Sequence, residues 1–334
     1  MNILIFRTDR IGDFMISSIL IKSIKRSYPN SIIQVVSSNK NYDYIKKYSL
    51  INNVYLHRKS SFIETFKLIN LLNKINFDYT FVIDGKKRSI FLSLFINSSY
   101  KIYTITKKIF MFLSFKNNNS VIFDNESEFN KIQIIKKNLN LINCCIEDND
   151  FNIFSNEIIA SDFDLNKLKI SEDNYVIFHL DEKWIYKEYI QSYTNIEPNI
   201  NQFEKFIYIL LEKTKKNLII TSGIKSNLLF NQLKSGYVKF NQNIYFMNYN
   251  KLKVILCENL NIFDLIFLIS KSSLLITCHG APSHIASSFN IKSIDIIDTS
   301  EYLLFNKYTA HLRNYNQISR KPFAKLCDEI ISLS

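Results

Sequence analysis

The sequence predicts an α/β protein built from doubly wound, mostly parallel sheets, and three observations support this fold class. Short apolar runs typical of buried strands alternate with segments whose apolar residues recur at helical spacing. Several predicted strands end at a glycine, as in α/β proteins that bind ligands at the carboxyl edge of a sheet. The 334 residues exceed the length that one hydrophobic core usually serves, so two domains are expected.

The opening segment is the clearest unit of the pattern. Residues 2–7 read as an apolar strand and residues 8–13 as a tight turn into a helix. Apolar residues at i, i+3, i+4 and i+8 from position 16 predict that helix, and Pro29 closes it. The turn places Asp13 beside the exposed amides of a helix start.

Strands and helices keep alternating through the first half of the chain. Further strands are expected at 32–36, 54–56 and 79–83, and helices at 42–48, 62–75 and 126–141. The helix over 62–75 has Phe62, Phe66, Ile69 and Leu72 on one side. Polar clusters loosen the pattern between 117 and 171, so the domain boundary is expected near residues 155–172. The two domains are then 1–160 and 172–334.

A second α/β series follows this boundary. It starts with a strand at 175–180. Further strands are expected at 218–221, 244–246, 274–277 and 293–297, and helices at 202–214, 226–234, 262–269 and from Pro282 onward.

The net charge of +12 is concentrated at the front of the chain. Residues 1–119 hold 19 Lys and Arg against 6 Asp and Glu, whereas the rest holds 23 against 24. A basic front domain suggests an anionic partner, such as a phosphorylated glycolipid, a membrane surface or nucleic acid. A Lys-, Asn- and Ile-rich composition with solvated lysines explains the charge equally well.

Several classes of protein are disfavoured by composition and motifs. No run approaches the roughly 18 apolar residues of a membrane span, and the start lacks a basic leader, so a cytoplasmic protein is expected. The five cysteines form no Cys-x-x-Cys pair and the histidines are dispersed, which argues against structural zinc. Neither G-x-G-x-x-G nor a P-loop occurs. Asp162-Phe163-Asp164 resembles a metal clamp but lies in the expected linker.

Candidate site residues gather after the predicted strands. Gly12, Gly85, Gly223 and Gly280 each follow a strand, two per domain, and together would line a cleft, although ordinary turns explain any one of them. Asp13 is either a general base or a carboxylate that stabilises the first turn of its helix, and Asp9 is its nearby competitor.

Two motifs are suited to anions. Lys86-Lys87-Arg88 follows a front strand and would hold a phosphate or carboxylate, unless it is a solvated basic loop. In the rear domain, Lys183 and Trp184 follow the first strand. Residues 277–286 pass from a strand into a helix that has Pro282 at its start. Free amides at that helix start would fit a diphosphate without a metal.

Taken together, these motifs resemble the glycosyltransferase family 9 heptosyltransferases, which have the two-domain GT-B fold and transfer heptose from ADP-heptose to lipopolysaccharide. The family's Gly-Asp opening is matched by Gly12-Asp13, its Asp-to-basic-Ser motif by Asp84 to Ser89, and its Lys-Trp segment by Lys183-Trp184. In the family's Asp-[Ser/Thr]-Gly-x-x-His signature, His279 stands where the acid is usual, while Ser283-His284-Ile285-Ala286 fits.

The resemblance implies an inverting, metal-independent transferase without a cofactor, whose donor is a nucleotide-diphosphate sugar. Asp13 would be the catalytic base. The expected acceptor-binding residues are Arg10, Gly12, Lys87 and Arg88, and the expected donor-binding residues are Lys183, Thr221, Gly223, His279, Gly280, Ala281, Ser283 and His284. The acceptor would be an anionic glycolipid, with peripheral contact at the inner membrane. Because the family acid is missing, ADP-heptose as the donor does not follow.

Two other readings stay open from the sequence. A degenerate transferase that binds a nucleotide or glycan without turnover is compatible with His279. A nucleic-acid binder would need a continuous basic stripe with exposed aromatic rings. The predicted core already uses most of the aromatic residues, so nucleic acid is the least favoured partner.

Overall fold

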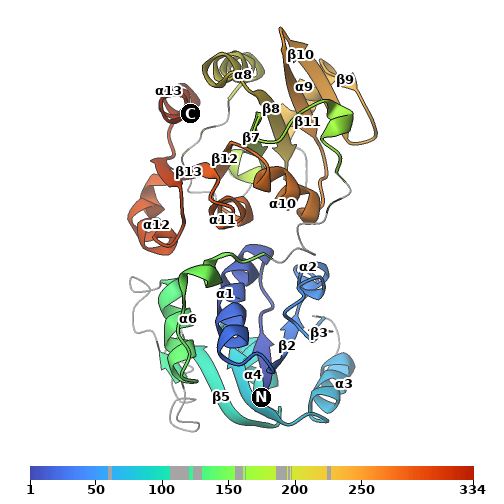
Figure 1. The fold of residues 1–334 in the computed structure, drawn as a ribbon, viewed down its shortest axis with the longest axis vertical. Coiled ribbons are helices and arrows are strands. Elements are labelled where there is room, and N and C mark those ends of the chain that lie inside the picture. Colours follow the sequence, from blue (N-terminus) through green and yellow to red (C-terminus); the bar gives the residue numbers. More distant parts are fainter. Residues whose placement is uncertain are drawn as a thin grey trace. The chain divides into compact units, whose positions relative to one another are not determined.

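The computed structural model describes residues 1–58, 62–105, 120–122, 130–154, 161, 163–185, 194, 196, 198–223 and 227–334. The chain divides into two compact units, Met1–Ile158 and Ile159–Ser334, and each contains one sheet (Figure 1). The predicted linker motif Asp162-Phe163-Asp164 is only partly described, because Asp162 lies outside these residues.

The sheet of unit 1 is parallel throughout and has the order β3-β2-β1-β4-β5-β6. Its strands are β1 (Asn2–Phe6), β2 (Ile32–Ser37), β3 (Asn53–Leu56), β4 (Phe77–Val82), β5 (Ser98–Ile105) and β6 (Ser120–Ile122). The strand order reverses between β1 and β4. In doubly wound folds such a reversal marks the place where ligands bind.

Helices cover both faces of this sheet. They are α1 (Ile11–Ser27), α2 (Tyr42–Lys46), α3 (Phe62–Leu72), α4 (Lys87–Leu94) and α6 (Lys131–Asn140). Leu4 and Phe6 of β1 belong to one apolar cluster with residues of α3 and α4. Since side chains alternate along a strand, Ile3 and Ile5 face the opposite side of the sheet. Both pairs are buried, as a sheet covered on two faces requires.

The sheet of unit 2 has the order β14-β13-β12-β7-β8-β11-β10-β9. Its strands are β7 (Tyr175–Leu180), β8 (Asn217–Ser222), β9 (Val238–Lys239), β10 (Ile244–Tyr249), β11 (Leu252–Cys257), β12 (Leu274–Cys278), β13 (Lys292–Ile297) and β14 (Tyr315–Ser319). Only β9 and β10 run antiparallel to their neighbours. The six parallel strands repeat the order of unit 1, and here the reversal falls between β12 and β7.

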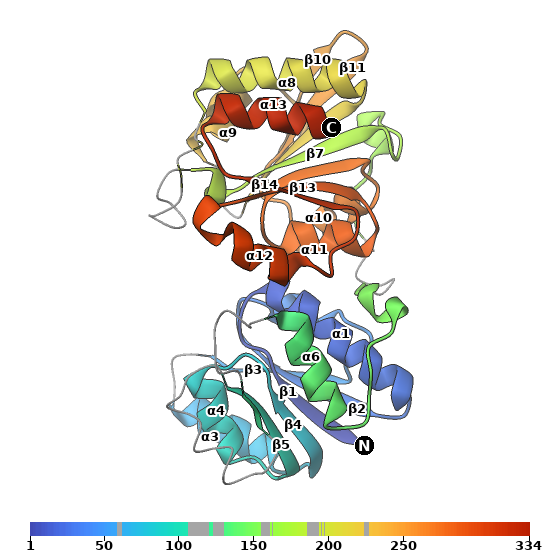
Figure 2. The ribbon, with the colours of Figure 1, turned by 90° about the vertical axis from the view of Figure 1, so that its left-hand side faces the viewer.

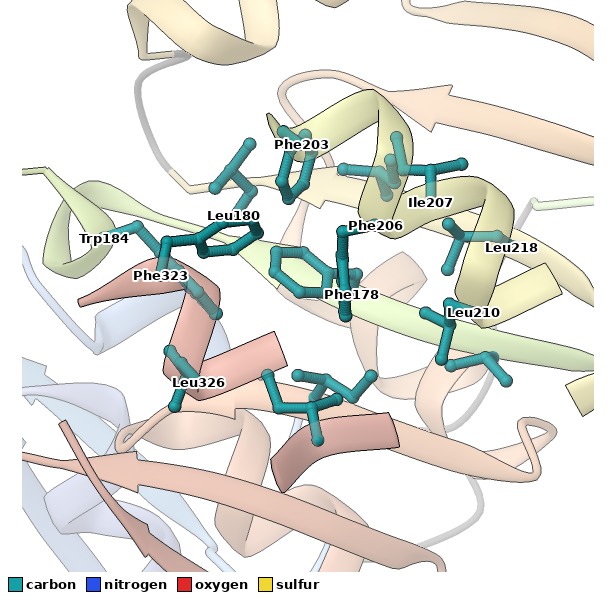
Figure 3. Close-up of a cluster of buried hydrophobic side chains, with 14 of the residues drawn as sticks. Phe178, Leu180, Trp184, Phe203, Phe206, Ile207, Leu210, Leu218, Phe323 and Leu326 are labelled. Carbon is teal, nitrogen blue, oxygen red and sulfur yellow. The ribbon is translucent and has the colours of Figure 1, made fainter. Parts of the chain in front are cut away.

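The core of unit 2 is aromatic where two helices meet the sheet. The helices of this unit are α8 (Ile200–Thr214), α9 (Leu228–Ser235), α10 (Ile262–Ser270), α11 (Ala281–Ser288), α12 (Tyr302–Thr309) and α13 (Phe323–Leu333). Figures 2 and 3 show α8 and α13 packed over β7. The Phe178 ring of β7 contacts Trp184, Phe203 and Phe206, and Phe323 of α13 contacts the last two. This cluster fixes the loop after β7, because Trp184 is buried in it.

The predicted fold class is confirmed, with local differences. Strands β5, β6, β9, β11 and β14 and helices α4, α12 and α13 were not predicted. Helix α6 begins at Lys131, and 126–129 of the predicted helix lie outside the described residues. In α3, Ile69 and Leu72 are buried as expected, but Phe62 and Phe66 are exposed. The core cluster contains α3 residues only from Leu68 onward, so the first turn of this helix extends past it.

Among the described residues, no helix combines the length and the apolar character that crossing a bilayer requires.

Candidate active site

In unit 1, polar side chains join the ends of the two strands at the reversal point. Arg7, the residue after β1, donates from Nη1 to the Ile83 carbonyl beyond β4 at 3.1 Å. The Thr8 hydroxyl donates to Asp84 Oδ2 at 2.7 Å, and the Ser89 hydroxyl donates to the same oxygen at 2.6 Å. Asp84 therefore ties the loop after β1 to the start of α4, and this edge is ordered before any ligand binds.

Asp13 lies in the first turn of α1 and is surrounded by positive charge. Lys131 Nζ is 2.8 Å from its Oδ1, and Arg7 Nη2 is 3.8 Å from the same oxygen. Arg7 also donates to the Asp13 carbonyl through Nε and Nη2, at 3.1 and 2.7 Å. Burial opposes ionisation, but Lys131 and Arg7 outweigh it and hold the pKa of Asp13 below its usual value. Asp13 is therefore an ionised carboxylate at neutral pH, and a quarter of it remains exposed.

Asp9, the competitor for the role of base, has the opposite electrostatic character. Burial raises its pKa to about 6, and the Arg7 charge only partly offsets this rise. Arg7 Nε is 3.2 Å from Asp9 Oδ1, but that buried oxygen receives no hydrogen bond from the described residues. Two carboxylates four residues apart thus titrate in different pH ranges.

The expected acceptor residues lie along the same edge. Arg10 is the exposed N-cap of α1, and Gly12 is the second residue of that helix. Lys87 and Arg88 are exposed in the first turn of α4. Sequence reasoning missed Lys131, which comes from α6 and has no motif around it. Only the topology brings it to Asp13, 118 residues away.

In unit 2, a partly buried cation lies at the reversal point between β7 and β12. Lys183 follows β7, and its ammonium contacts the Asp181 carboxylate directly. The same nitrogen donates to the Cys278 carbonyl at the end of β12, at 3.2 Å. Burial disfavours the cation, but the Asp181 charge outweighs it and raises the pKa of Lys183. Lys183 therefore stays charged at the carboxyl edge of the sheet.

At two of the predicted glycines, a side chain would come close to neighbouring atoms at this edge. A Cβ on Gly280 would lie 3.0 Å from Lys183 Nζ, and a Cβ on Gly223 would lie 2.9 Å from Glu182 Oε2 and 3.0 Å from Asp181 Cβ. At Gly223 the main chain approaches Asp181 too closely for a side chain, whereas at Gly280 the nearest atom is the end of the flexible Lys183 side chain, which would have to shift slightly. The site residues from β7, β8 and β12 are therefore held within contact distance of one another.

The helix start after Gly280 offers fewer free amides than predicted. The Ser283 N–H donates to the Gly280 carbonyl at 3.2 Å, and the Gly280 N–H points to Ser283 Oγ at 3.4 Å. Pro282 has no N–H. Of the first amides of this described turn, the Ala281 N–H is thus the one that these contacts leave over. The Lys183 ammonium, rather than a group of amides, is the main positive charge of this edge.

Thr221 is bonded inside unit 2, and its predicted contact with the donor stays a prediction. It lies in β8 with no exposed surface, and its hydroxyl is 2.8 Å from His179 Nδ1. Burial lowers the pKa of His179 to about 4, so this imidazole is neutral near pH 7. The sequence pattern identified the end of β8 but could not tell which side of the sheet the hydroxyl occupies.

His279, which replaces the family acid, is held by a buried carboxylate from the next strand. Asp295 of β13 pairs in register with Thr277, and its Oδ2 lies 2.6 Å from His279 Nδ1. The Tyr315 hydroxyl donates to the same oxygen at 2.8 Å. Because Asp295 Oδ2 accepts from Tyr315, the geometry suits a His279 tautomer whose Nδ1–H donates to the same oxygen. The His279 side chain is 19% exposed.

His284 is mostly buried in α11. Its ring packs edge-on against His279, at 5.5 Å between ring centroids, and is stacked at 5.9 Å on His311. The His279 ring also meets Phe305 edge-on at 4.8 Å. His284 therefore supports the orientation of His279, whereas its predicted direct contact with the donor stays a prediction.

We expect Asp295→Asn to release His279 from its single tautomer. The amide can present its N–H₂ group to Nδ1, and the buried site loses its negative charge. Long-range ¹H–¹⁵N spectra of the ring should show protonated Nδ1 in the wild type and a mixture of tautomers in the variant. Unfolding by urea should be easier by about 1–3 kcal/mol. Tyr315→Phe, which keeps the His279 contact, should leave the tautomer unchanged.

The Asp-x-Asp motif has a local explanation at its described acid. Asp164 accepts a hydrogen bond from the Asn166 N–H at 2.9 Å, as expected of a turn residue. Within the described part of the chain, no group of three His, Cys, Asp or Glu is arranged to hold a metal ion.

Comparison with known proteins finds similarity in structure but not in sequence. No protein-family model and no curated protein matches the chain. The E. coli heptosyltransferase WaaC with ADP has a TM-score of 0.71 at 11% identity, with 100% of both chains covered. E. coli ADP-heptose lps heptosyltransferase II scores 0.66 at 13% identity, with 100% of this chain and 98% of that chain covered.

A glycosyl transferase family 9 structure from Veillonella parvula scores 0.65 at 11% identity and covers 98% of this chain and 88% of its own. At sequence identities this low, the structural similarity establishes the fold alone, and the function has to be argued from the site. The motifs that suggested the resemblance lie at the reversal points of the two sheets. The chain therefore has the GT-B fold of the glycosyltransferase family 9 heptosyltransferases, as its motifs predicted.

Proposed function

We propose that the chain is an inverting glycosyltransferase that moves a sugar from a nucleotide-diphosphate donor to an anionic glycolipid. Unit 2 binds the donor and unit 1 binds the acceptor. The observation that carries this proposal is the charged, partly buried Lys183 packed against Gly280 at the reversal point of the unit 2 sheet. Nucleotides bind at this position of doubly wound sheets, and a solved structure of similar fold contains ADP.

The donor diphosphate would lie beside Lys183, at the sheet edge where Gly223 and Gly280 pack against the loop after β7. A diphosphate needs positive charge most when the sugar bond breaks, because charge then develops on its leaving oxygen. A lysine held by Asp181 supplies that charge without reorganisation. For this reason we propose a reaction that uses no metal ion and no further cofactor.

On the acceptor side, Asp13 has the state that a base requires. It is ionised at neutral pH and partly exposed. In the proposed step, an Asp13 oxygen removes the proton of an acceptor hydroxyl while that hydroxyl oxygen bonds to the anomeric carbon. The bond from this carbon to the phosphate oxygen breaks, and the nucleoside diphosphate leaves. Attack from the face opposite the leaving group inverts the anomeric centre.

The sugar is constrained by His279. A carboxylate at this position would accept hydrogen bonds from sugar hydroxyls, whereas an imidazole oriented by Asp295 offers Nε2 instead. One ring nitrogen satisfies fewer hydroxyls than two carboxylate oxygens. ADP-heptose therefore remains one candidate donor among nucleotide sugars.

A thermal-unfolding screen with nucleoside diphosphates and their sugars tests the proposal. A ligand at 100 times its dissociation constant adds about 2.7 kcal/mol to the free energy of unfolding, which corresponds to a shift of several degrees. We expect one base to stand out, and its diphosphate to bind more tightly than its monophosphate. If no nucleotide or nucleotide sugar shifts the transition, the donor site proposed here is wrong.

The second candidate is a non-catalytic binding protein of the same fold. The ion pair between Asp13 and Lys131 favours it, because a paired carboxylate with a lowered pKa is a weaker base. Both functions require nucleotide binding, so turnover distinguishes them. Release of nucleoside diphosphate in the presence of a glycolipid acceptor supports the transferase, and tight binding without release supports the alternative.

A further inference from the structure

Unit 1 exposes an unusual amount of apolar surface on two neighbouring helices. Of the sixteen large apolar side chains that are exposed in the described residues, seven belong to α3, α4 and the residue that ends α4. These are Phe62, Ile63, Phe66, Leu71, Phe91, Leu94 and Phe95. Phe62 is 86% exposed, Phe66 64% and Phe91 58%. An exposed hydrophobic patch of this kind marks an interaction surface.

The two helices that carry these side chains are neighbours. Both pack on the same face of the unit 1 sheet, through the cluster that contains Leu68, Ile69, Ile90 and Leu92. Their ends are hydrogen-bonded, because Asn73 Nδ2 donates to the Phe95 carbonyl at 2.8 Å. Figure 2 shows α3 and α4 beside each other at the edge of unit 1. We call the outward side of this pair the α3–α4 face.

Basic residues accompany the apolar ones. Lys67 and Lys74 are exposed on α3 and just beyond its end, and Lys87 and Arg88 are exposed at the start of α4. Glu64 is the one exposed acid within α3, and α4 contains none. A surface of phenylalanine and leucine with surrounding lysine and arginine matches an anionic bilayer, where rings enter the interface and cations meet lipid headgroups.

The α3–α4 face is continuous with the acceptor edge. Helix α4 starts directly after the loop that follows β4, where Asp84 is bonded to Thr8 and Ser89. Lys87 and Arg88 are therefore both predicted acceptor contacts and the first residues of the face. A glycolipid acceptor presents its sugar next to a membrane surface, so its anchor and its headgroup would meet adjoining parts of unit 1.

We propose that the α3–α4 face docks the protein on an anionic membrane surface. The proposal rests on the proposed function for its choice of occupant, since a membrane-held acceptor explains why the face adjoins the acceptor edge. The binding itself does not depend on catalysis.

Flotation of the full chain with vesicles tests the face directly. We expect binding to vesicles of phosphatidylcholine mixed with phosphatidylglycerol, weaker binding to phosphatidylcholine alone, and loss of affinity as salt is raised. Phe62→Ser combined with Phe66→Ser should lower the partition coefficient by about tenfold or more, because two rings no longer enter the interface. Donor-induced thermal stabilisation should be unchanged in this variant.

A matched control comes from unit 2. Leu228 is 68% exposed and Val238 63%, and neither contributes to the α3–α4 face or to the site. Leu228→Ser combined with Val238→Ser should bind vesicles as the wild type does. The proposal is overturned if the wild type ignores anionic vesicles, or if both double variants lose binding equally. It is also overturned if Phe62→Ser with Phe66→Ser converts a dimer to a monomer and leaves vesicle binding intact, since a second copy would then be the occupant.

The outcomes separate this proposal from the proposed function. Vesicle binding through the face without any sugar transfer supports the surface and contradicts the transferase. Transfer to a soluble, lipid-free acceptor by a protein that never binds vesicles supports the transferase and contradicts the surface.

Discussion

Replacing Asp13 by Asn is expected to lower the rate of glycosyl transfer by about two to four powers of ten. The amide has nearly the same shape but cannot take the proton of the acceptor hydroxyl. Donor binding should not change, because Asp13 belongs to unit 1 and the donor site to unit 2. Initial rates of nucleoside diphosphate release, together with donor titrations, measure both quantities. Near-normal transfer by Asp13→Asn would show that another group is the base.

The pH dependence of the rate distinguishes Asp13 from Asp9. A base works only when it is deprotonated, so activity falls as pH drops through its pKa. If Asp13, whose pKa is lowered, is the base, the acidic limb of the pH–rate profile should lie below pH 4. The rate should then be flat between pH 5 and 7. With Asp9, whose pKa is about 6, the rate should fall about tenfold per pH unit below 6.

Lys131→Met refines this assignment. It removes the nearest positive charge from Asp13, so the pKa of that carboxyl should rise and the acidic limb should move to higher pH. Asp9→Asn is the matched control within the same turn, and it should leave the position of the limb unchanged. A limb that disappears in Asp9→Asn but does not move in Lys131→Met would assign the base to Asp9.

Most of the fold was predictable because its signals are local. Buried parallel strands such as β1, β4, β7 and β12 are mostly apolar, and a glycine or proline marks the turn that follows several of them. Among the strands that were missed, β14 and β5 have a weaker signal, whereas β11 contains the buried apolar run 254–257. Edge strand β14 is polar at Asn316 and Gln317, and β11 begins after a two-residue turn in which Asn250 has a positive φ. Strand β5 carries an exposed Tyr100 and a half-buried Lys101 among its apolar residues.

The partners of the site residues were less predictable than the residues themselves. Asp13, Lys183 and His279 stand in motifs that follow strands, so the sequence identifies them. Lys131 and Asp295 have no motif, and only the strand order and the helix packing bring them to Asp13 and His279. Apolar periodicity likewise predicted a buried side for α3, but it carries no information on where the core beneath that helix ends. For that reason Phe62 and Phe66 were expected inside and lie outside.

The second large effect is expected at Lys183. Its removal takes the main positive charge from the donor site, and kcat/KM should fall by about 10²–10³. Lys183→Met alone is difficult to interpret, because it leaves Asp181 buried without its cation, which costs about 3–5 kcal/mol of stability. The double variant Asp181→Asn with Lys183→Met removes both charges and should fold at nearly wild-type stability.

The double variant also separates a phosphate contact from a purely structural ion pair. If Lys183 binds the diphosphate, this variant should lose about 10- to 100-fold in affinity for the nucleoside diphosphate, since a hydrogen bond to a charged group is worth about 1.5–3 kcal/mol. Its affinity for the corresponding nucleoside should stay the same, because that ligand brings no phosphate to the site. Titration calorimetry with both ligands gives the comparison. If the diphosphate binds the double variant as well as the wild type, Lys183 serves only to pair with Asp181, and the observation on which the proposed function depends no longer supports it.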